Sequence, residues 1–299
     1  MKIFVTGASG FIGSAVVAEL VAAGHSVVGL ARSDASADAV AAAGAQVHRG
    51  SLDDLDALRA GADASDGVIH LAFRHDFDDY ANAAELDRQA IDTLGSALAG
   101  SGRPFVVTSG MIGLTGASGV ITEFDGAAST SPRFSETAAL PWADRGVRVS
   151  ILRLPPTVHG EGDHGFVPHL IEIARDNGVS GYPAEGANRW PAVHRLDAAG
   201  LFRQAVESAP AGAIWHAVDD GGIPVRDIAG IIGRHLGVPV TSIPADAVAT
   251  HFGWIGPLFS MDAPASSERT RQSSGWSPTH VGLIDDLEHG HYFDAAVRV

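Results

Sequence analysis

The 299 residues of this chain are 45% hydrophobic and 18% charged, carry a net charge of −15, and include no cysteine. This is the composition of a globular protein large enough for one α/β core and a smaller lobe. The lack of cysteine excludes disulfides and thiolate chemistry. The negative charge argues against nucleic acid or anionic membranes as partners, because phosphate binding needs clustered basic residues and Lys2 is the only lysine.

The sequence shows no sign of a membrane segment. No uninterrupted apolar run reaches about eighteen residues, the length that a transmembrane helix needs. The start MKIFVTG has the pattern of a strand and lacks the basic and apolar regions of a signal peptide. We therefore expect a cytoplasmic protein.

The chain opens with a strand, a glycine turn and a helix. An apolar run over residues 3–5 ends at Thr6, and Gly7, Gly10 and Gly13 then lead into a helix rich in Ala, Val and Leu. In such a turn the first glycine allows the tight bend, the second lets phosphates approach the backbone, and the third lets the helix pack on the strand. The free N–H groups and positive dipole end of the helix then face the anion. The turn predicts a dinucleotide site, with a tight turn without ligand as the alternative.

Strands and helices alternate through the first half of the chain. Continuous apolar runs indicate strands that are buried on both faces, as in a parallel sheet. The alternation predicts an α/β fold with a doubly wound parallel sheet and right-handed crossovers. We expect strands at 2–6, 26–31, 46–49, 67–72, 104–109 and 147–154, and helices near 11–23, 34–43, 53–61, 79–100 and 134–145.

The character of the sequence changes after Pro155. Residues 155–192 are rich in Gly, His and Pro and indicate few long helices, whereas a helix at 196–208 and a strand near 213–218 are expected to return to the sheet. The remaining short helices and Pro-rich turns predict a small lobe over the carboxyl edge of the strands, where ligands of open α/β sheets bind. We expect a dinucleotide-binding domain at 1–154, to which 193–218 return, and a substrate lobe formed by 155–192 and 219–299.

The end of the second strand bears on the choice of cofactor. A site for NAD usually carries an acid there to bind the ribose 2′-hydroxyl, and here Ala31 has that place. Arg32 and Ser33 follow, and a guanidinium and a hydroxyl suit a 2′-phosphate. The sequence therefore favours NADP(H). The alternative is that Arg32 is a solvated loop residue and that Ser33 or Asp34 caps the next helix.

Five segments, at 6–13, 68–72, 106–109, 152–160 and 193–197, resemble in that order the motifs of the extended short-chain dehydrogenase/reductases. This group includes the NAD-dependent epimerase/dehydratases. The resemblance implies a Rossmann fold and a nicotinamide cofactor. It also implies dimerisation through the helices near 79–100 and 134–145, although the second helix is short and a monomer stays open. The implied cofactor contacts are Gly7, Ser9, Gly10, Phe11, Ile12, Gly13, Arg32, Ser33, Ser51, Leu52, Leu71, Ala72, Phe73, Thr108 and Pro155.

The catalytic pattern of that family is incomplete here. Most members use a Tyr-x-x-x-Lys pair with a Ser, in which Tyr moves the proton and Lys lowers its pKa and holds the ribose. This chain cannot supply the pair, because none of its three tyrosines has a lysine four residues later. The family's serine often occupies the position of Gly110. Ser109, at the carboxyl end of a central strand, is then the best-placed hydroxyl, and Arg133 is the nearest cation to the position of the missing pair.

A polar loop over 159–166 follows the sixth strand. We expect it to gate the substrate site, with His164 and Phe166 facing the pocket, and a solvated turn is the alternative. A metal site in this loop is disfavoured, since the spacing matches no tight site; its ligands would be His159, Glu161, Asp163 and His164. We interpret His194 and Asp197 as anchors of the following helix.

Three functions are compatible with these features. The first is reduction of a ketone or aldehyde by hydride transfer, with a group other than Tyr donating the proton. The second is non-redox epimerisation, isomerisation or elimination, and the third is a dinucleotide-binding sensor or scaffold without turnover. The lobe favours an NADPH-dependent carbonyl reductase for a small, partly apolar substrate. The expected substrate contacts are His75, Met111, His159, His164, Phe166, Tyr182 and Trp190.

Overall fold

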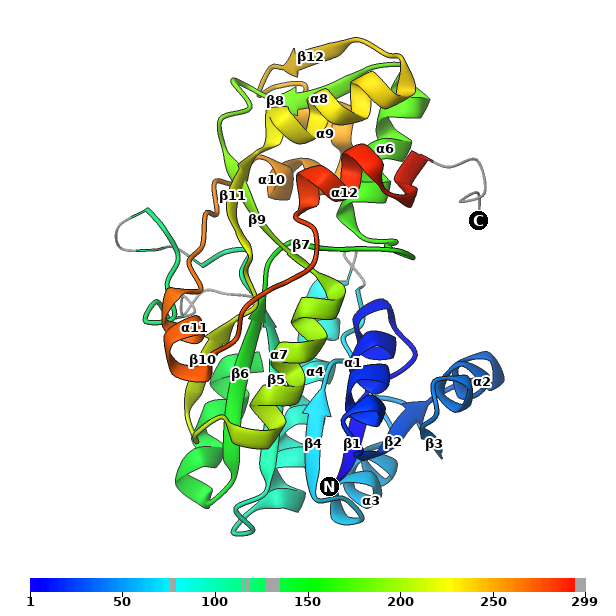
Figure 1. The fold of residues 1–299 in the computed structure, drawn as a ribbon, viewed down its shortest axis with the longest axis vertical. Helices are drawn as coiled ribbons and strands as arrows, with labels where there is room; N and C mark the ends of the chain where they lie inside the picture. The colour runs from blue at the N-terminus through cyan, green and yellow to red at the C-terminus, as the bar shows by residue number, and fades with distance from the viewer. Residues whose placement is uncertain (76–78, 115, 117–118, 127–134, 294–299) are drawn as a thin grey trace.

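A seven-stranded parallel sheet is the largest element of the fold (Figure 1). The computed structural model describes residues 1–75, 79–114, 116, 119–126 and 135–293. The strand order is β10-β6-β5-β4-β1-β2-β3, which confirms the doubly wound α/β fold. The strands are β1 (Lys2–Thr6), β2 (Ser26–Ala31), β3 (Gln46–Arg49), β4 (Gly67–His70), β5 (Pro104–Gly110), β6 (Arg148–Leu154) and β10 (Ala213–His216).

Helices cover both faces of this sheet, which explains its continuous apolar strands. Side chains alternate along a strand, so Val106 packs with α1 (Phe11–Ala22) and α7 (Arg195–Ser208), whereas Val107 packs with α3 (Leu55–Asp63) and α4 (Tyr80–Leu98). The helix α2 (Asp34–Ala42) links β2 to β3.

The helix expected at 134–145 is divided into two pieces. It consists of α5 (Ser135–Ala139) and the 3₁₀ helix η1 (Leu140–Arg145). Pro141 lies in the first turn of η1, where its missing N–H is tolerated but an α-helix cannot continue through it. The conformation therefore changes at this proline.

A lobe lies beyond the carboxyl ends of the large sheet (Figure 1). Its core contains Trp190, Ile228 and Leu287. It has a three-stranded sheet of order β11-β9-β7 and a pair of strands, β8 and β12. Its elements are β7 (Thr157–His159), α6 (Phe166–Asn177), β8 (Ser180–Pro183), β9 (Arg189–His194), β11 (Asp220–Pro224), α8 (Val225–Leu236), β12 (Val240–Ile243), α9 (Val248–Phe252), η2 (Gly253–Ile255), α10 (Gly256–Phe259), α12 (Leu283–His289) and η3 (His291–Phe293).

Among the described residues of 155–192, the twelve-residue α6 is the one helix, in keeping with the expectation of few long helices there. Its buried residues Val167, Leu170, Ile171 and Ala174 have helical spacing and face the lobe core. The Gly- and Pro-rich segments on either side of α6 dominate the composition of this region and obscure that periodicity.

The C-terminal segment connects the two parts of the molecule. After α11 (Glu268–Ser274), which lies beside β10, the chain crosses to α12 in the lobe (Figure 1). No helix in the described part of the chain is long and apolar enough to cross a membrane.

Candidate dinucleotide and active site

The glycine turn between β1 and α1 leaves no room for side chains. Gly7 has a φ of +70°, and a Cβ there would lie 2.8 Å from the backbone nitrogen of Ala72. A Cβ on Gly13 would lie 1.9 Å from the carbonyl oxygen of Gly7. Gly10 caps α1 without a side-chain hydrogen bond, so no capping side chain covers the first turn of the helix. The backbone is therefore shaped to admit a dinucleotide pyrophosphate at this helix N-terminus.

A buried chain of hydrogen bonds fixes the two strand ends around this turn. The Thr6 hydroxyl accepts the N–H groups of Leu71 and Ala72, both at 3.2 Å, and lies 2.9 Å from Nδ1 of His70. Since this hydroxyl must donate its own proton to Nδ1, the His70 Nε2–H donates to Asp87, 3.1 Å away. Asp87 also accepts from the Ser135 hydroxyl at 2.6 Å.

We did not assign Thr6, His70, Asp87 or Ser135 from the sequence. One signal was available: His70 ends an otherwise apolar strand, and Asp87 lies on the buried face of α4. The N–H groups of Leu71 and Ala72 donate to Thr6. A cofactor would therefore contact the backbone carbonyls and side chains of these two residues.

The two residues expected to hold a 2′-phosphate differ in their surroundings at the end of β2. Ser33 caps α2 by accepting a hydrogen bond from the Ser36 N–H at 3.2 Å. This is the capping role that the sequence offered as the alternative to phosphate binding. Arg32 is exposed, and its side chain makes no hydrogen bond or ion pair with any described residue. Nearby, Ser51 donates to Asp53, and Leu52 packs partly buried against the core under β2.

Ser109 lies in a polar row across three neighbouring strands. Ser109, Arg153 and His216 are register partners on β5, β6 and β10, so they project from the same face of the sheet. Arg153 is fully buried and binds Glu136 of α5 through two hydrogen bonds of 2.8 Å. Its Nη1 also donates to Nε2 of His216, 3.2 Å away. Ser109 thus faces the layer of α5, the helix that follows the missing Tyr–Lys position.

The remaining residues near this edge are dispersed. Thr108 faces the opposite side of the sheet from Ser109 and is buried, as is Pro155. Phe73 contacts both His75 and Tyr80, with ring centroids 5.2 Å and 5.7 Å away. Arg133 lies outside the described residues.

The loop after β7 binds to the C-terminal segment and to α1. His159 is buried, and its Nδ1 lies 2.7 Å from Asp286 of α12. Asp163 accepts from the Tyr292 hydroxyl at 2.7 Å, and burial raises the pKa of this carboxyl. The ring of His164 lies 5.7 Å from that of Phe11, the first residue of α1. The loop therefore reaches the glycine turn, although His159 itself points into the lobe.

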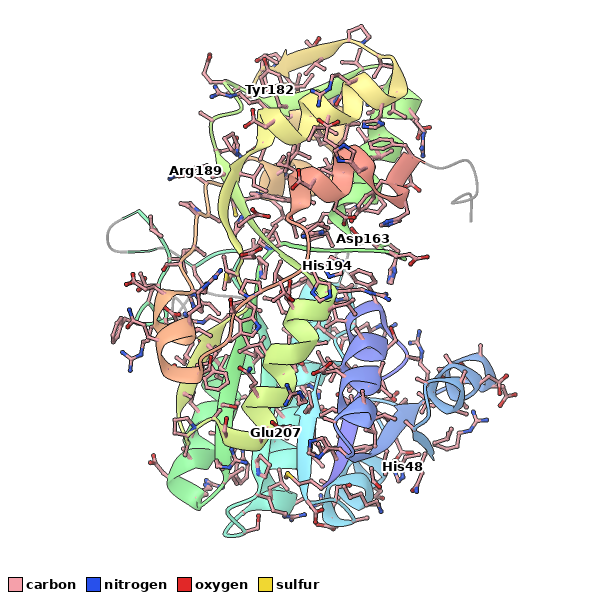
Figure 2. The ribbon with its side chains drawn as sticks, in the orientation of Figure 1. His48, Asp163, Tyr182, Arg189, His194 and Glu207 are labelled. Atoms are coloured by element: carbon pink, nitrogen blue, oxygen red, sulfur yellow. The ribbon has the colours of Figure 1, made fainter. Side chains whose placement is uncertain are left out.

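The predicted apolar lining of a substrate pocket is not brought together. Met111 is fully buried in a small cluster with Leu114 and Val218, and Trp190 is only 1% exposed in the lobe core. Phe166 packs on Trp190. Tyr182 lies at the far end of the lobe, away from Asp163 and His194 at its junction with the large sheet (Figure 2). These four residues stabilise the interior of the molecule or lie far from the glycine turn.

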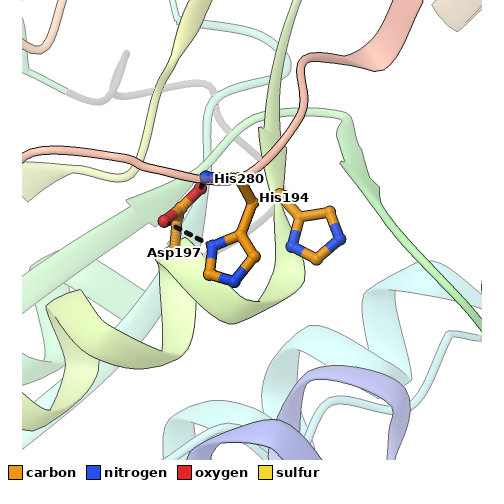
Figure 3. A group of neighbouring side chains, drawn as sticks. All are labelled: His194, Asp197 and His280. Atoms are coloured by element: carbon orange, nitrogen blue, oxygen red, sulfur yellow. Dashed lines mark hydrogen bonds and ion pairs between the residues drawn. The ribbon is translucent and has the colours of Figure 1, made fainter. Parts of the chain in front are cut away.

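His194, Asp197 and His280 form the one group of three His and acidic residues in the described residues whose ligand atoms lie within 4.8 Å of one another (Figure 3). Their hydrogen bonds are structural. Asp197 accepts the N–H groups of Thr279 and His280 at 2.9 and 3.0 Å, and Nδ1 of His280 at 2.8 Å. His194 accepts from the Leu196 N–H at 3.2 Å. His194 therefore caps the start of α7, as expected, whereas Asp197 holds the segment at residues 279–280 against this helix.

Burial lowers the pKa of His194 to about 4, with His159 and His280 adding to the effect. The ring stacks on His280 with centroids 4.7 Å apart. His194 is therefore neutral at pH 7, as its role as a hydrogen-bond acceptor requires.

The fold and the glycine turn define a nucleotide-binding α/β protein, and comparison with known proteins identifies the family. The model of the NAD-dependent epimerase/dehydratase family matches residues 3–97. An uncharacterized protein of Schizosaccharomyces pombe is 49% identical over 98% of this chain and 100% of its own length. A second, from Saccharomyces cerevisiae, is 48% identical over 96% and 98%. The chain belongs to the NAD-dependent epimerase/dehydratase family, among the extended short-chain dehydrogenase/reductases.

More distant proteins share the fold. A ketoreductase of 4-hydroxy-2-methyl-3-oxo-4-farnesyl-3,4-dihydroquinoline-1-oxide from Stigmatella aurantiaca is 25% identical over 85% of this chain and 80% of its own. DesIV, a dTDP-glucose 4,6-dehydratase from Streptomyces venezuelae solved with NAD, superposes with a TM-score of 0.77 at 22% identity, covering 96% and 95% of the two chains. MoeE5 with UDP-glucose and NAD gives 0.74 at 21%, covering 96% of each. This chain thus has the nicotinamide-dinucleotide-binding fold of its family.

Proposed function

We propose that this protein is an NADPH-dependent carbonyl reductase that converts a ketone or aldehyde to an alcohol. The observation that carries the proposal is the position of Ser109 at the same carboxyl edge of the parallel sheet as the glycine turn. The two lie on β5 and after β1, with only β4 between these strands. Ser109 is largely buried, with 6% of it exposed, and its hydroxyl would reach a substrate that is bound beside the cofactor, without the Tyr–Lys pair.

The residues that would hold the cofactor fit a dinucleotide. The turn from Gly7 to Gly13 offers backbone N–H groups and a helix N-terminus to the pyrophosphate. Arg32, with no partner among the described residues, is available to the 2′-phosphate that distinguishes NADP(H) from NAD(H). When bound, the nicotinamide supplies the hydride.

Ser109 would donate a hydrogen bond to the carbonyl oxygen and pass on the proton that the alkoxide gains, its own hydroxyl then being reprotonated from water. A serine hydroxyl is a weak acid, so its contribution is mainly a hydrogen bond to the developing negative charge. Arg153 lies next to it on β6 but is neutralised by Glu136. The reaction would then depend more on positioning than on a strong general acid.

The relative from Stigmatella aurantiaca, whose name is that of a ketoreductase, supports carbonyl reduction. The solved structures of DesIV, a dTDP-glucose 4,6-dehydratase, and of MoeE5 with UDP-glucose favour a second candidate, non-redox chemistry on a sugar nucleotide. Dinucleotide binding without turnover, as in a sensor or scaffold, is the third.

The deciding experiment follows NADPH absorbance with a panel of aldehydes, aryl ketones, keto esters and cyclic ketones. Turnover that disappears in the Gly13→Ala variant would support the reductase, because that change fills the cofactor turn. Tight NADPH binding with no oxidation across the panel would contradict it. Incubation with UDP-glucose and analysis of the products would then separate epimerisation from a non-catalytic role.

A further inference from the structure

Two helix N-termini converge at the cofactor turn. The helices α1 and α7 pack side by side and begin at the same end (Figure 1). Phe11 and Arg195 are their first residues, and the guanidinium carbon of Arg195 lies 5.1 Å from the centroid of the Phe11 ring. Because Phe11 directly follows Gly10, this places a cation from the far half of the chain beside the pyrophosphate turn.

The loop after β7 holds Arg195 in this position. A Cβ on Gly160 would lie 3.3 Å from Cγ of Arg195, and one on Gly162 would lie 3.7 Å from its Nη1. The loop is itself fixed, since Asp163 accepts from Gly165 N–H and from the Tyr292 hydroxyl, each at 2.7 Å. The half-buried guanidinium is thus confined between a rigid loop and an aromatic ring.

Arg195 also lacks a counter-ion in the part of the chain that the structure describes. Within the described ranges no carboxylate lies at ion-pair distance from it, whereas Arg153, Arg189 and Arg203 each pair with one at 2.9 Å or less. A half-buried cation flanked by two helix N-termini is a favourable place for an anion.

We propose that Arg195 binds the pyrophosphate of the dinucleotide from the lobe side and closes the cofactor site opposite the glycine turn. The proposal rests on the dinucleotide site and not on carbonyl reduction. The pyrophosphate of a sugar-nucleotide substrate has the same chemistry, but contact with Phe11 of the glycine turn favours the cofactor.

The test measures the dissociation constants of NADPH and NADH by nucleotide fluorescence for the wild type, Arg195→Gln and Arg195→Lys. The pyrophosphate is common to both dinucleotides, so we expect Arg195→Gln to weaken both about ten-fold or more, the effect of one lost charge-assisted hydrogen bond. The lysine variant should recover part of the affinity, since it keeps the charge but loses the planar fork. Arg226→Gln, an exposed arginine at the start of α8, is the control for net charge and should change neither constant.

Unchanged constants in a folded Arg195→Gln variant would overturn the proposal, as would a loss restricted to NADPH, which would assign Arg195 to the 2′-phosphate. Weaker binding of UDP with unchanged dinucleotide binding would overturn it in favour of a substrate diphosphate. A protein that binds NADPH through Arg195 but reduces no carbonyl would contradict the proposed function and leave this inference intact.

Discussion

Arg32 is the single residue on which the proposed cofactor preference depends. Its side chain is exposed and unpaired among the described residues, and no acid stands at the end of β2 to repel a phosphate. We expect Arg32→Ala to weaken NADPH at least ten-fold and NADH hardly at all, since only NADPH carries the 2′-phosphate. Titration of both dinucleotides checks this. Arg59→Ala, which removes an exposed charge from α3, is the control, and equal losses for NADPH and NADH would contradict the assignment.

Ser109 is the residue on which the proposed proton transfer depends. Ser109→Ala should lower kcat with the best carbonyl substrate about ten-fold or more and leave the NADPH dissociation constant unchanged, because only the hydroxyl beside the substrate is lost. Steady-state kinetics measure this effect, with Ser96→Ala on the exposed face of α4 as the matched variant. Full activity of Ser109→Ala would move the proton donor elsewhere.

The glycine turn determines the geometry of α1 as an element. A methyl group at Gly13 would meet the Gly7 carbonyl oxygen at 1.9 Å, and a backbone atom cannot move aside as a side chain can. We expect Gly13→Ala to abolish dinucleotide binding and to lower the free energy of unfolding by more than about 2 kcal/mol.

Gly200 in α7 offers the matched control, because no atom beyond its own turns of helix backbone lies within 4 Å of the position of its Cβ. Gly200→Ala should stabilise the protein by up to about 1 kcal/mol, since alanine is the better helix former. Urea unfolding of both variants tests the pair. A Gly13→Ala protein with normal stability and NADPH affinity would show that the turn adjusts.

The elements of the first half were predictable because each is determined locally. The inner strands of the large sheet are buried on both faces, so they are largely apolar runs between glycines and caps, whereas the edge strand β3 is polar and exposed. The observed bounds of all seven strands lie within a few residues of those expected. In the lobe, the strands β8 and β12 pair residues that are 60 positions apart in the chain, such as Ser180 and Val240, and have no periodicity of their own. Their existence follows from packing against α8 and α6.

At the scale of the whole molecule, buried histidines connect stability to pH. Burial lowers the pKa of His216 from 6.5 to about 4, and the positive charge of Arg153 acts in the same direction. Its Nδ1–H donates to the Ser266 carbonyl at 2.7 Å and its Nε2 accepts from Arg153, so there is no place for a second proton.

Below pH 6.5 the unfolded chain therefore binds a proton at His216, whereas the folded protein binds this proton only at about pH 4 and below. Stability should fall as the pH is lowered through this window, by on the order of 3 kcal/mol for this residue, and His194 acts in the same direction. Urea unfolding between pH 7 and pH 4 measures the slope, which should be shallower in His216→Gln and unchanged in His289→Gln, an exposed histidine of α12. Equal slopes in all three proteins would contradict the assignment.

The sequence by itself determined the doubly wound fold, the glycine turn and the absence of a Tyr–Lys pair, because backbone geometry and apolar periodicity are properties of neighbouring residues. Only the tertiary structure decided which distant side chains meet: His70 with Asp87, Arg153 with Glu136 and His216, and Arg195 with Phe11. The tertiary structure also shows that the side chains of Met111 and Trp190 are buried in the interior of the molecule. Contacts of this kind depend on how helices cross strands and how the C-terminal segment returns over the lobe, and no local pattern in the chain encodes them.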